Sequence, residues 1–387
     1  MTPAARLAAA IEVLDPVLAG APVEQVLTNW GRAHRFAGSG DRYALRDLVF
    51  AALRCRRSFA ALGGGMTGRG LVLGLVRAQG QDPASLFTGQ GHAPAVVEAG
   101  EAGRLPEGDE ALDVPDWLAP GLRASLGGDY EATMRAMQHR APVYLRVNVA
   151  RITQEAALAR LAQDGIGAEP VSWVKTAVKV IENERKVQNS SAYLEGLVEL
   201  QDASSQAVIE ALDLRRGMRV LDYCAGGGGK TLAMAAAGLV VDAHDAAQQR
   251  MTGLPDRAAR AGAKVRIVSD PVGPYDLVLM DVPCSGSGSW RRDPQGKWAL
   301  TPEGLATLTQ TQAAILDRCV TLVARGGVLA YATCSLLRDE NEAQIAAFLA
   351  RHPGWTASFQ TRFSPLQGGD GFFVAKLTQS VEISAQP

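Results

Sequence analysis

The sequence predicts an α/β protein: a doubly wound parallel sheet in the C-terminal half, preceded by a small α/β module and an all-helical N-terminal region. From about residue 200 onward, short apolar runs alternate with segments of helical periodicity. The run at 277–280 is unbroken and flanked by Gly and Pro, which is typical of a strand buried on both faces. Residues 4–80 instead repeat apolar side chains at helical spacing.

The chain has 387 residues, 47% of them hydrophobic, which is enough for two or three domains of about 100–200 residues each. No run approaches the roughly 18–20 apolar residues of a membrane span. The N-terminus shows no signal-peptide pattern, so we expect a cytoplasmic protein without a membrane partner.

The five cysteines are an odd, sparse set, which argues against a disulfide framework and for reduced thiols. None has the spacing of a zinc site, so we expect no metal. Cys55 and Cys319 are interpreted as small buried apolar residues. Cys224, Cys284 and Cys334 lie in motifs discussed below.

Charge is distributed unevenly although the net charge is only −1. Arginines outnumber acids in residues 1–80, whereas residues 81–131 are acidic, with Arg104 and Arg123 as their cations. A basic module beside an acidic linker indicates nucleic-acid binding, but a solvated helix face explains the pattern equally well.

The N-terminal region is expected to form helices at 4–13, 23–30, 41–62 and 71–78. Asp41 is the expected N-cap of the third helix, and the glycines at 63–65 are expected to end it. Residues 80–115 are interpreted as loops and linker, giving a first domain over 1–113.

The second domain is expected over 114–199. Its predicted elements are helices at 117–126 and 153–163 and strands at 143–149 and within 171–180. Thr153 is the expected N-cap of its second helix. Its cations Arg146, Arg151, Lys175 and Lys179 suit contact with a polyanion, although scattered surface charge explains any one of them.

The third domain is expected over 200–380. Its predicted strands are 219–222, 239–244, 265–268, 277–281, 327–332 and 371–377. Its predicted helices are 201–212, one ending at 237, 307–323 and 340–351. Alternation on this scale predicts a parallel sheet with helices on both faces.

Ligands of such sheets bind at the carboxyl ends of the strands. The first strand runs into a glycine-rich turn at 223–231, which lets a ligand approach the backbone. Asp245 ends the second strand, where it can bind a ribose diol, and Asp270 ends the third, where it can contact an adenine amino group. The turn lacks GxGxxG and P-loop spacing, so an adenosine-containing ligand is favoured without a choice of class.

Cys284 and Cys334 follow two strands of the same predicted sheet, so their side chains are expected to meet above its carboxyl edge. Two thiols at one site indicate covalent chemistry, for which a thiolate is the nucleophile. A thiolate adding to carbon 6 of cytosine would activate carbon 5 toward an electrophilic methyl group. Arg291, Arg292 and Lys297 are expected to supply positive charge there or to hold phosphates.

Several motifs together resemble the Sun family of RNA (cytosine-C5)-methyltransferases. They are D-V-P-C-S-G-S-G at 281–288, R-R-D-P at 291–294, K-W at 297–298, Y-A-T-C-S at 331–335, E-N-E at 340–342, Q-D-A-S-S-Q at 201–206 and D-G-F-F-V-A at 370–375. The resemblance covers about 115–377. It implies a Rossmann-like methyltransferase domain, an RNA-recognition-like middle module and a NusB-like RNA-binding N-terminal domain.

The resemblance also implies roles for single residues. Cys334 would be the nucleophile, Cys284 would assist product release, and Asp281 would hydrogen-bond the cytosine ring. S-adenosylmethionine would be bound by Cys224, Ala225, Gly226, Gly227, Gly228, Gly229, Lys230, Asp245, Arg250, Asp270 and Asp281.

One loop departs from the family pattern. The family usually has C-A-A-P-G-G-K where this chain has C-A-G-G-G-G-K at 224–230. Losing the proline raises the conformational entropy lost on cofactor binding. This altered loop supports one alternative function, a non-catalytic RNA-binding assembly factor. A DNA cytosine methyltransferase is a weaker alternative. We expect a monomer acting on RNA, with ribosomal RNA favoured over transfer RNA.

Overall fold

The computed structural model describes residues 1–379 and divides the chain into two compact units. Unit 1 comprises Met1–Arg140 together with Trp290–Ala299, and unit 2 comprises Ala141–Ser289 and the chain from Leu300 onward. Helices α7 (Ala119–Leu126) and α8 (Tyr130–Met137) cluster with unit 1. The domain division expected at 113/114 and 199/200 stays a prediction.

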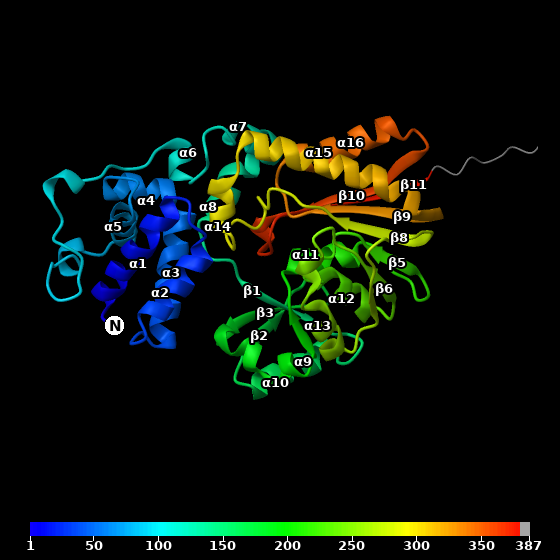
Figure 1. Cartoon of the computed structure of the whole chain (residues 1–387), viewed down its shortest axis with the longest axis horizontal. Helices are drawn as coiled ribbons and strands as arrows, with labels where there is room; N and C mark the ends of the chain where they lie inside the picture. Colours follow the sequence, from blue (N-terminus) through cyan, green and yellow to red (C-terminus); the bar gives the residue numbers. More distant parts are fainter. Residues whose placement is uncertain (380–387) are drawn as a thin grey trace, which may run out of the picture. The chain divides into compact units, whose positions relative to one another are not determined.

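Unit 1 is all-helical, as expected from its periodicity. Its first five helices enclose a core that includes Leu14, Leu45 and Leu71. These helices are α1 (Pro3–Leu18), α2 (Val23–Ala33), α3 (Ser39–Arg54), α4 (Arg56–Gly63) and α5 (Gly68–Ala78) (Figure 1). The acidic stretch that follows contains only short helices, including α6 (Gly108–Ala111).

The single helix expected over 41–62 is wrong, because the chain breaks at Cys55 into α3 and α4. Asp113 Oδ1 accepts hydrogen bonds from the backbone N–H groups of Arg57 (2.8 Å) and Ser58 (2.9 Å), which caps the new helix from a distant part of the chain. Asp41 is not the N-cap of α3, which is Gly38. Its carboxylate instead binds the N-terminal ammonium group at 3.1 Å.

Residues 290–299, here called the strap, belong to unit 1 although unit 2 precedes and follows them in sequence. The strap contains helix α14 (Pro294–Ala299) and caps two helices of unit 1. Gln295 accepts from the backbone N–H of Val23 (3.0 Å) at the start of α2, which has no side-chain cap of its own. Lys297 Nζ (3.1 Å) and Trp298 Nε1 (2.6 Å) donate to carbonyl groups in the last turn of α3.

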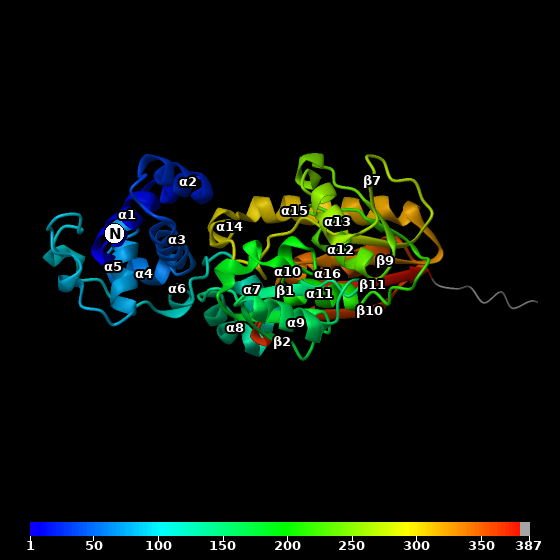
Figure 2. The same ribbon diagram turned by 90° about the horizontal axis from the view of Figure 1, so that it is seen from below.

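Unit 2 contains two sheets. The smaller has the antiparallel order β2-β3-β1-β4. Its strands are β1 (Val143–Val147), β2 (Gly167–Pro170), β3 (Ala177–Glu182) and β4 (Val198–Leu200). Helix α9 (Gln154–Gln163) begins after Thr153, whose side chain caps it as predicted. Figure 2 shows α9 and α10 (Ser191–Leu194) beside this sheet.

The larger sheet has the order β10-β11-β9-β8-β5-β6-β7. Its strands are β5 (Arg219–Asp222), β6 (Val240–Ala243), β7 (Val265–Ile267), β8 (Tyr275–Asp281), β9 (Val323–Thr333), β10 (Trp355–Phe363) and β11 (Phe372–Gln379). Neighbours from β9 to β7 are parallel, as predicted, but β11 pairs antiparallel with both β9 and β10. The sheet is therefore mixed, and β10 was not predicted.

Helices cover both faces of the larger sheet (Figure 1). They are α15 (Pro302–Cys319) and α16 (Glu342–Arg351) on one face, and α11 (Ala203–Glu210), α12 (Gly229–Ala236) and α13 (Leu254–Ala261) on the other. The core strands β8 and β9 are nearly continuous in buried residues, as a sheet covered on both faces requires. This doubly wound arrangement leaves the carboxyl ends of β5, β8 and β9 at one edge.

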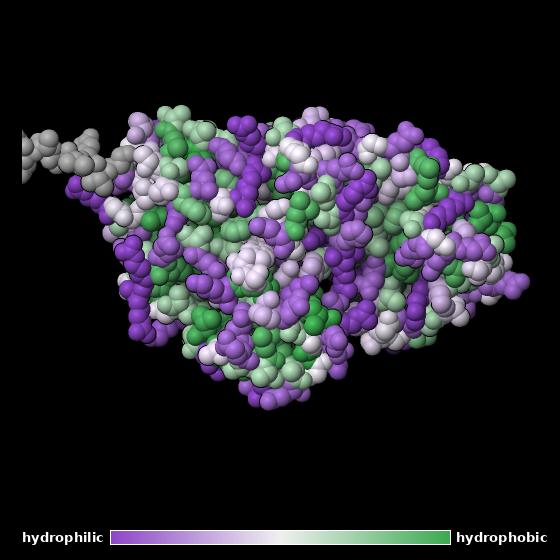
Figure 3. Space-filling view, turned by 180° about the vertical axis from the view of Figure 1, so that it is seen from behind, coloured by the Kyte–Doolittle hydropathy of each residue, from purple (hydrophilic) through white to green (hydrophobic). Residues whose placement is uncertain are grey.

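Within residues 1–379, no single helix is long and apolar enough to span a bilayer. Only α4 and α5 taken together reach that length and apolar composition, and this pair is bent by 89°. The face in Figure 3 carries hydrophilic and hydrophobic residues interspersed with one another.

Candidate active site

A cavity of about 550 Å³ opens at the carboxyl ends of β5, β8 and β9. Its size is in the range of small-molecule sites. Its lining residues are Gln201, Ser205, Asp222, Cys224, Ala225, Gly226, Gly227, Gly229, Lys230, Arg250, Asp281, Val282, Pro283, Cys284 and Cys334. The cavity therefore contains both thiols and most of the predicted cofactor residues.

The two predicted cysteines meet at this edge. Cys334 follows the last residue of β9, and Cys284 lies three residues beyond the end of β8. β8 and β9 are adjacent and parallel, which brings the two loops to the same edge of the sheet, and the two sulfur atoms lie 3.4 Å apart. The hydrogen bond with Cys334, together with burial, raises the pKa of Cys284 well above its usual value. Cys284 therefore keeps its proton near neutral pH.

The glycine-rich turn is shaped by two residues with positive φ. Gly226 has φ +51° and Gly228 has φ +81°, a region that side-chain-bearing residues rarely adopt. A Cβ on Gly228 would lie 2.2 Å from Leu254 Cδ1. Helix α12 begins immediately after this turn, at Gly229. Backbone atoms are thus exposed to the cavity at the N-terminus of a helix, a site that favours polar or anionic ligand groups.

Asp245 stabilises this turn through hydrogen bonds to its carboxylate. It is 3% exposed, and its carboxylate accepts from the backbone N–H of Gly226 (2.8 Å) and from Ala247 (2.9 Å). Arg250, which lines the cavity, also donates to it at 3.1 Å. In the structure Asp245 orders the turn and is not among the lining residues.

Lys230 and Asp281 form an ion pair at 2.7 Å in the wall of the cavity. Burial alone would lower the pKa of Lys230, but the Asp281 carboxylate keeps it above its usual value. Asp281 remains partly accessible, with 31% of its side chain exposed, so it can still contact a ligand.

Asp222 was not predicted as a site residue, although it ends β5 and lines the cavity. Its Oδ2 accepts from the Thr231 hydroxyl at 2.7 Å, while its buried Oδ1 has no hydrogen-bond partner within residues 1–379. Burial raises its pKa to about 7. The signal that could have identified it is an acid at the end of a buried strand, directly before the glycine turn. Gln201 and Ser205 also line the cavity and were missed as site residues.

Some predicted residues lie elsewhere. Asp270 is outside the lining, 83% exposed, and pairs with Arg318 at 3.6 Å. Arg291 and Lys297 are buried in unit 1, where burial lowers the pKa of Lys297 to about 8. Their role beside the thiols stays a prediction. The strap takes them there because it caps the helices of unit 1.

Arg146 does not face a polyanion, because it is 4% exposed. It donates to the Gln201 side chain and to the Gly229 carbonyl (2.7 Å), which joins β1 of the small sheet to the cofactor turn. Burial lowers its pKa to about 10. The other cation on this segment, Arg151, donates to the carbonyl groups of Glu195 and Arg260.

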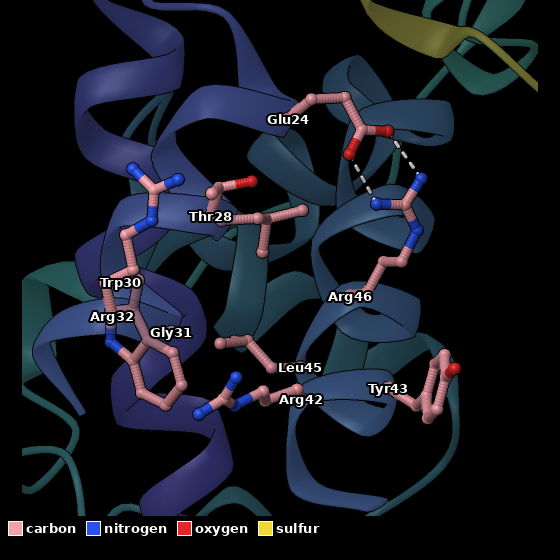
Figure 4. A pocket seen from close by; sticks show the side chains of 10 residues that line it. Glu24, Thr28, Trp30, Gly31, Arg32, Arg42, Tyr43, Leu45 and Arg46 are labelled. Atoms are coloured by element: carbon pink, nitrogen blue, oxygen red, sulfur yellow. Dashed lines mark hydrogen bonds and ion pairs between the residues drawn. The ribbon is translucent and has the colours of Figure 1, made fainter. Parts of the chain in front are cut away.

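Unit 1 has a cavity of about 380 Å³ between α2 and α3 (Figure 4). Arg32, Arg42 and Arg46 contribute to its wall, and Arg46 forms a two-point ion pair with Glu24 at 2.5 and 2.6 Å. Tyr43, at the same wall, is 47% exposed. This combination of cations and an aromatic ring has the composition of a nucleic-acid contact surface.

The comparisons with known proteins agree with this geometry. The family model for the 16S rRNA methyltransferase RsmB/F matches residues 209–378, and the model for the ferredoxin-like domain of RsmF/B-like methyltransferases matches 114–188. Ribosomal RNA small subunit methyltransferase B of Yersinia pseudotuberculosis is 35% identical over 282 residues. That alignment covers 68% of this chain and 66% of the relative, slightly less than two thirds of its length.

Two solved structures share the fold. The protein PH0851 aligns with a TM-score of 0.79 at 24% identity, covering 98% of this chain and 99% of its own. A methyltransferase homolog from Pyrococcus horikoshii aligns with a TM-score of 0.61 at 24% identity, covering 70% of this chain and 96% of its own. The predicted Rossmann-like domain, the small α/β module and the helical N-terminal region are confirmed. The chain belongs to the RsmB/F, or Sun, family of S-adenosylmethionine-dependent methyltransferases.

Proposed function

We propose that the protein methylates carbon 5 of a cytosine in RNA, with ribosomal RNA as its substrate, through a covalent bond between Cys334 and carbon 6 of the base. The observation that carries this proposal is the 3.4 Å separation of the Cys284 and Cys334 sulfur atoms in the wall of the cavity. A reaction that only transferred a methyl group to a strong nucleophile would need no thiol pair. The curated relatives, named as ribosomal RNA methyltransferases, support the choice of RNA.

The residues around the cavity fit S-adenosylmethionine. The glycine turn leaves the backbone open to a ligand, and the unpartnered Asp222 Oδ1 suits a ligand that brings a donor or a positive charge. We infer that the turn at 224–230, Arg250 and Asp281 hold the cofactor, with Asp245 acting through the turn. When bound, the cofactor supplies an electrophilic methyl group on a sulfonium sulfur.

The chemistry of the chain starts at Cys334. Its thiolate forms a bond to carbon 6 of cytosine, which gives carbon 5 the electron density to attack the methyl group. After methylation, carbon 5 loses its proton to a base, the 5,6 double bond re-forms, and the sulfur of Cys334 leaves as a thiolate. Asp281, partly exposed beside Lys230, is placed to hydrogen-bond the cytosine ring.

Cys284 is assigned to product release. It lies within hydrogen-bond distance of Cys334 and keeps its proton because of that contact and its burial. The Cys284 S–H can therefore stabilise the Cys334 thiolate before attack and after expulsion.

The target base has to leave its stack to reach sulfur atoms inside a cavity, which favours single-stranded or partly assembled RNA. We propose that the wall between α2 and α3, with Arg32, Arg42 and Tyr43, contacts RNA outside the target nucleotide. We further propose that the protein acts as a monomer in the cytoplasm, the compartment in which bacterial ribosomes assemble.

The test compares thiol variants by RNA bisulfite sequencing and by denaturing gel. We expect Cys334→Ala to abolish methylation without an adduct, and Cys284→Ala to accumulate a covalent protein–RNA complex. Cys55→Ala, away from the cavity, is the matched control and should keep full activity. Normal turnover by Cys284→Ala would refute the division of roles. Absence of S-adenosylmethionine binding at millimolar concentration, measured by calorimetry, would instead favour a non-catalytic assembly factor.

A further inference from the structure

Each cavity cysteine is followed directly by a serine, and both serines bind the same acid. Ser285 follows Cys284, and Ser335 follows Cys334. The hydroxyl groups of both serines donate to Oε2 of Glu340, each at 2.5 Å. One carboxylate oxygen thus connects the loop after β8 with the loop after β9.

Glu340 is fully buried, and both of its oxygens are occupied. Its Oε1 accepts from the backbone N–H of Ser285 (2.8 Å) and from Gln312 Nε2 (3.0 Å). The Tyr331 hydroxyl donates to its backbone carbonyl at 2.6 Å, which fixes the main chain of the residue. Four donors on one carboxylate match the full acceptor capacity of that group, so the cluster is complete without water or ligand.

We propose that Glu340 is a positioning residue that holds the two cysteine loops together and so sets the distance between the two sulfur atoms. The strand pair β8–β9 ends before either cysteine, so it does not fix their side chains by itself. Charge-assisted hydrogen bonds are short and stronger than neutral ones, which suits a group that has to keep two loops within a few tenths of an ångström. The effect of this role on catalysis rests on the proposed function. The effect on the distance between the two sulfur atoms does not depend on it.

The same carboxylate places a negative charge near Cys284. The hydrogen bond with Cys334 raises the pKa of Cys284 most, followed by burial and by the charge of Cys334. The charge of Glu340 raises the same pKa further. Tyr331 is an ionisable group near Cys284, and Asp222, Cys224, Lys230, Arg250 and Asp281 line the same cavity. Replacing Glu340 by Gln keeps its shape and removes its charge, so it should lower the pH at which Cys284 becomes reactive.

The first measurement is dithiol capture by phenylarsine oxide in the full-length protein, without RNA or cofactor. The reagent bonds its arsenic to two thiols and releases one water, so capture requires two sulfur atoms in contact. We expect Glu340→Ala to weaken capture about tenfold, as loss of a buried charged hydrogen-bond partner implies. Asp339→Asn, an exposed acid one residue away, is the matched control and should stay within about twofold of wild type. Cys284→Ala should abolish capture.

Two further variants keep the test decisive if Glu340→Ala does not fold. Ser285→Ala removes one of the two hydroxyl contacts and should also weaken capture. Glu340→Gln should retain capture but shift the pH midpoint of Cys284 alkylation by iodoacetamide, followed by mass spectrometry, to lower pH. A purely structural role of Glu340 would leave that midpoint in place.

Unchanged capture in Glu340→Ala or Ser285→Ala, or an unchanged alkylation midpoint in Glu340→Gln, would overturn the inference. These readouts need neither methyl donor nor RNA. A wild-type protein that captures the reagent but methylates no RNA would therefore refute the proposed function alone. If both proposals hold, Glu340→Ala should lower kcat at unchanged KM for RNA.

Discussion

Binding of S-adenosylmethionine should release a proton from Asp222. This carboxyl lines the cavity, its Oδ1 has no partner within residues 1–379, and burial raises its pKa to about 7. An opposite charge within about 4–6 Å lowers a carboxyl pKa by 1–3 units, and the sulfonium group of a cofactor held in this cavity would supply such a charge. The bound state thus favours the ionised carboxylate.

The size of the effect follows from the two pKa values. With a pKa of about 7, Asp222 is about 90% protonated at pH 6 in the free protein. If binding lowers that pKa by about 2 units, roughly 0.8 proton leaves per cofactor bound at pH 6, and only about 0.1 at pH 8. Apparent affinity should therefore rise with pH between 6 and 7 and then level off.

Calorimetry at pH 6 in buffers of different ionisation enthalpy measures this release directly. S-adenosylhomocysteine, which lacks the positive sulfur, is the matched ligand and should release much less. Asp222→Asn should abolish the buffer dependence with S-adenosylmethionine while leaving the turn intact. Equal heats in all buffers for the wild-type protein, or the same release in Asp222→Asn, would refute the reasoning.

Two further predictions concern local structure. Gln295→Ala removes the strap's bond to the Val23 N–H, so amide exchange at the start of α2 should accelerate about fivefold, which corresponds to about 1 kcal/mol for a lost cap. Gln25→Ala, exposed on the same helix, should change nothing, and equal exchange in both variants would contradict the capping role. Gly228→Ala combines a positive φ with a Cβ 2.2 Å from a leucine side chain and should lower the unfolding free energy by about 2–3 kcal/mol. Gly217→Ala shares the positive φ in open space and should cost only about 1 kcal/mol in the same urea titration.

The larger sheet was predictable because its central strands are continuous apolar runs bounded by turns. β5 matches its predicted range, and β8 begins only two residues earlier than expected. The antiparallel edge was not predicted, because in β10 (Trp355–Phe363) Trp355 is buried and the other residues are half-buried or exposed, so the strand lacks the pattern of a buried strand. The break at Cys55 was missed because the capping carboxylate, Asp113, lies far away in sequence.

The site residues were predictable where a strand end fixes their position. Residues directly after β8 and β9 were located correctly, because adjacent parallel strands bring their carboxyl ends together. Asp270 follows β7 at the far edge of the sheet, and its position in sequence did not reveal that its side chain points to solvent. The clustering of Lys297 with the N-terminal helices was not predictable, because Cys284, only 13 residues earlier in the sequence, belongs to unit 2.

The strap makes the chain pass between the two units three times, at 140/141, 289/290 and 299/300. A fragment ending at Arg140 would expose the first N–H group of α2 and the last carbonyl groups of α3 that the strap now satisfies. Unit 1 is thus discontinuous in sequence, and a single cut of the chain separates neither unit 1 nor unit 2 intact. Any truncation, domain swap or gene fusion has to carry residues 290–299 with the N-terminal helices.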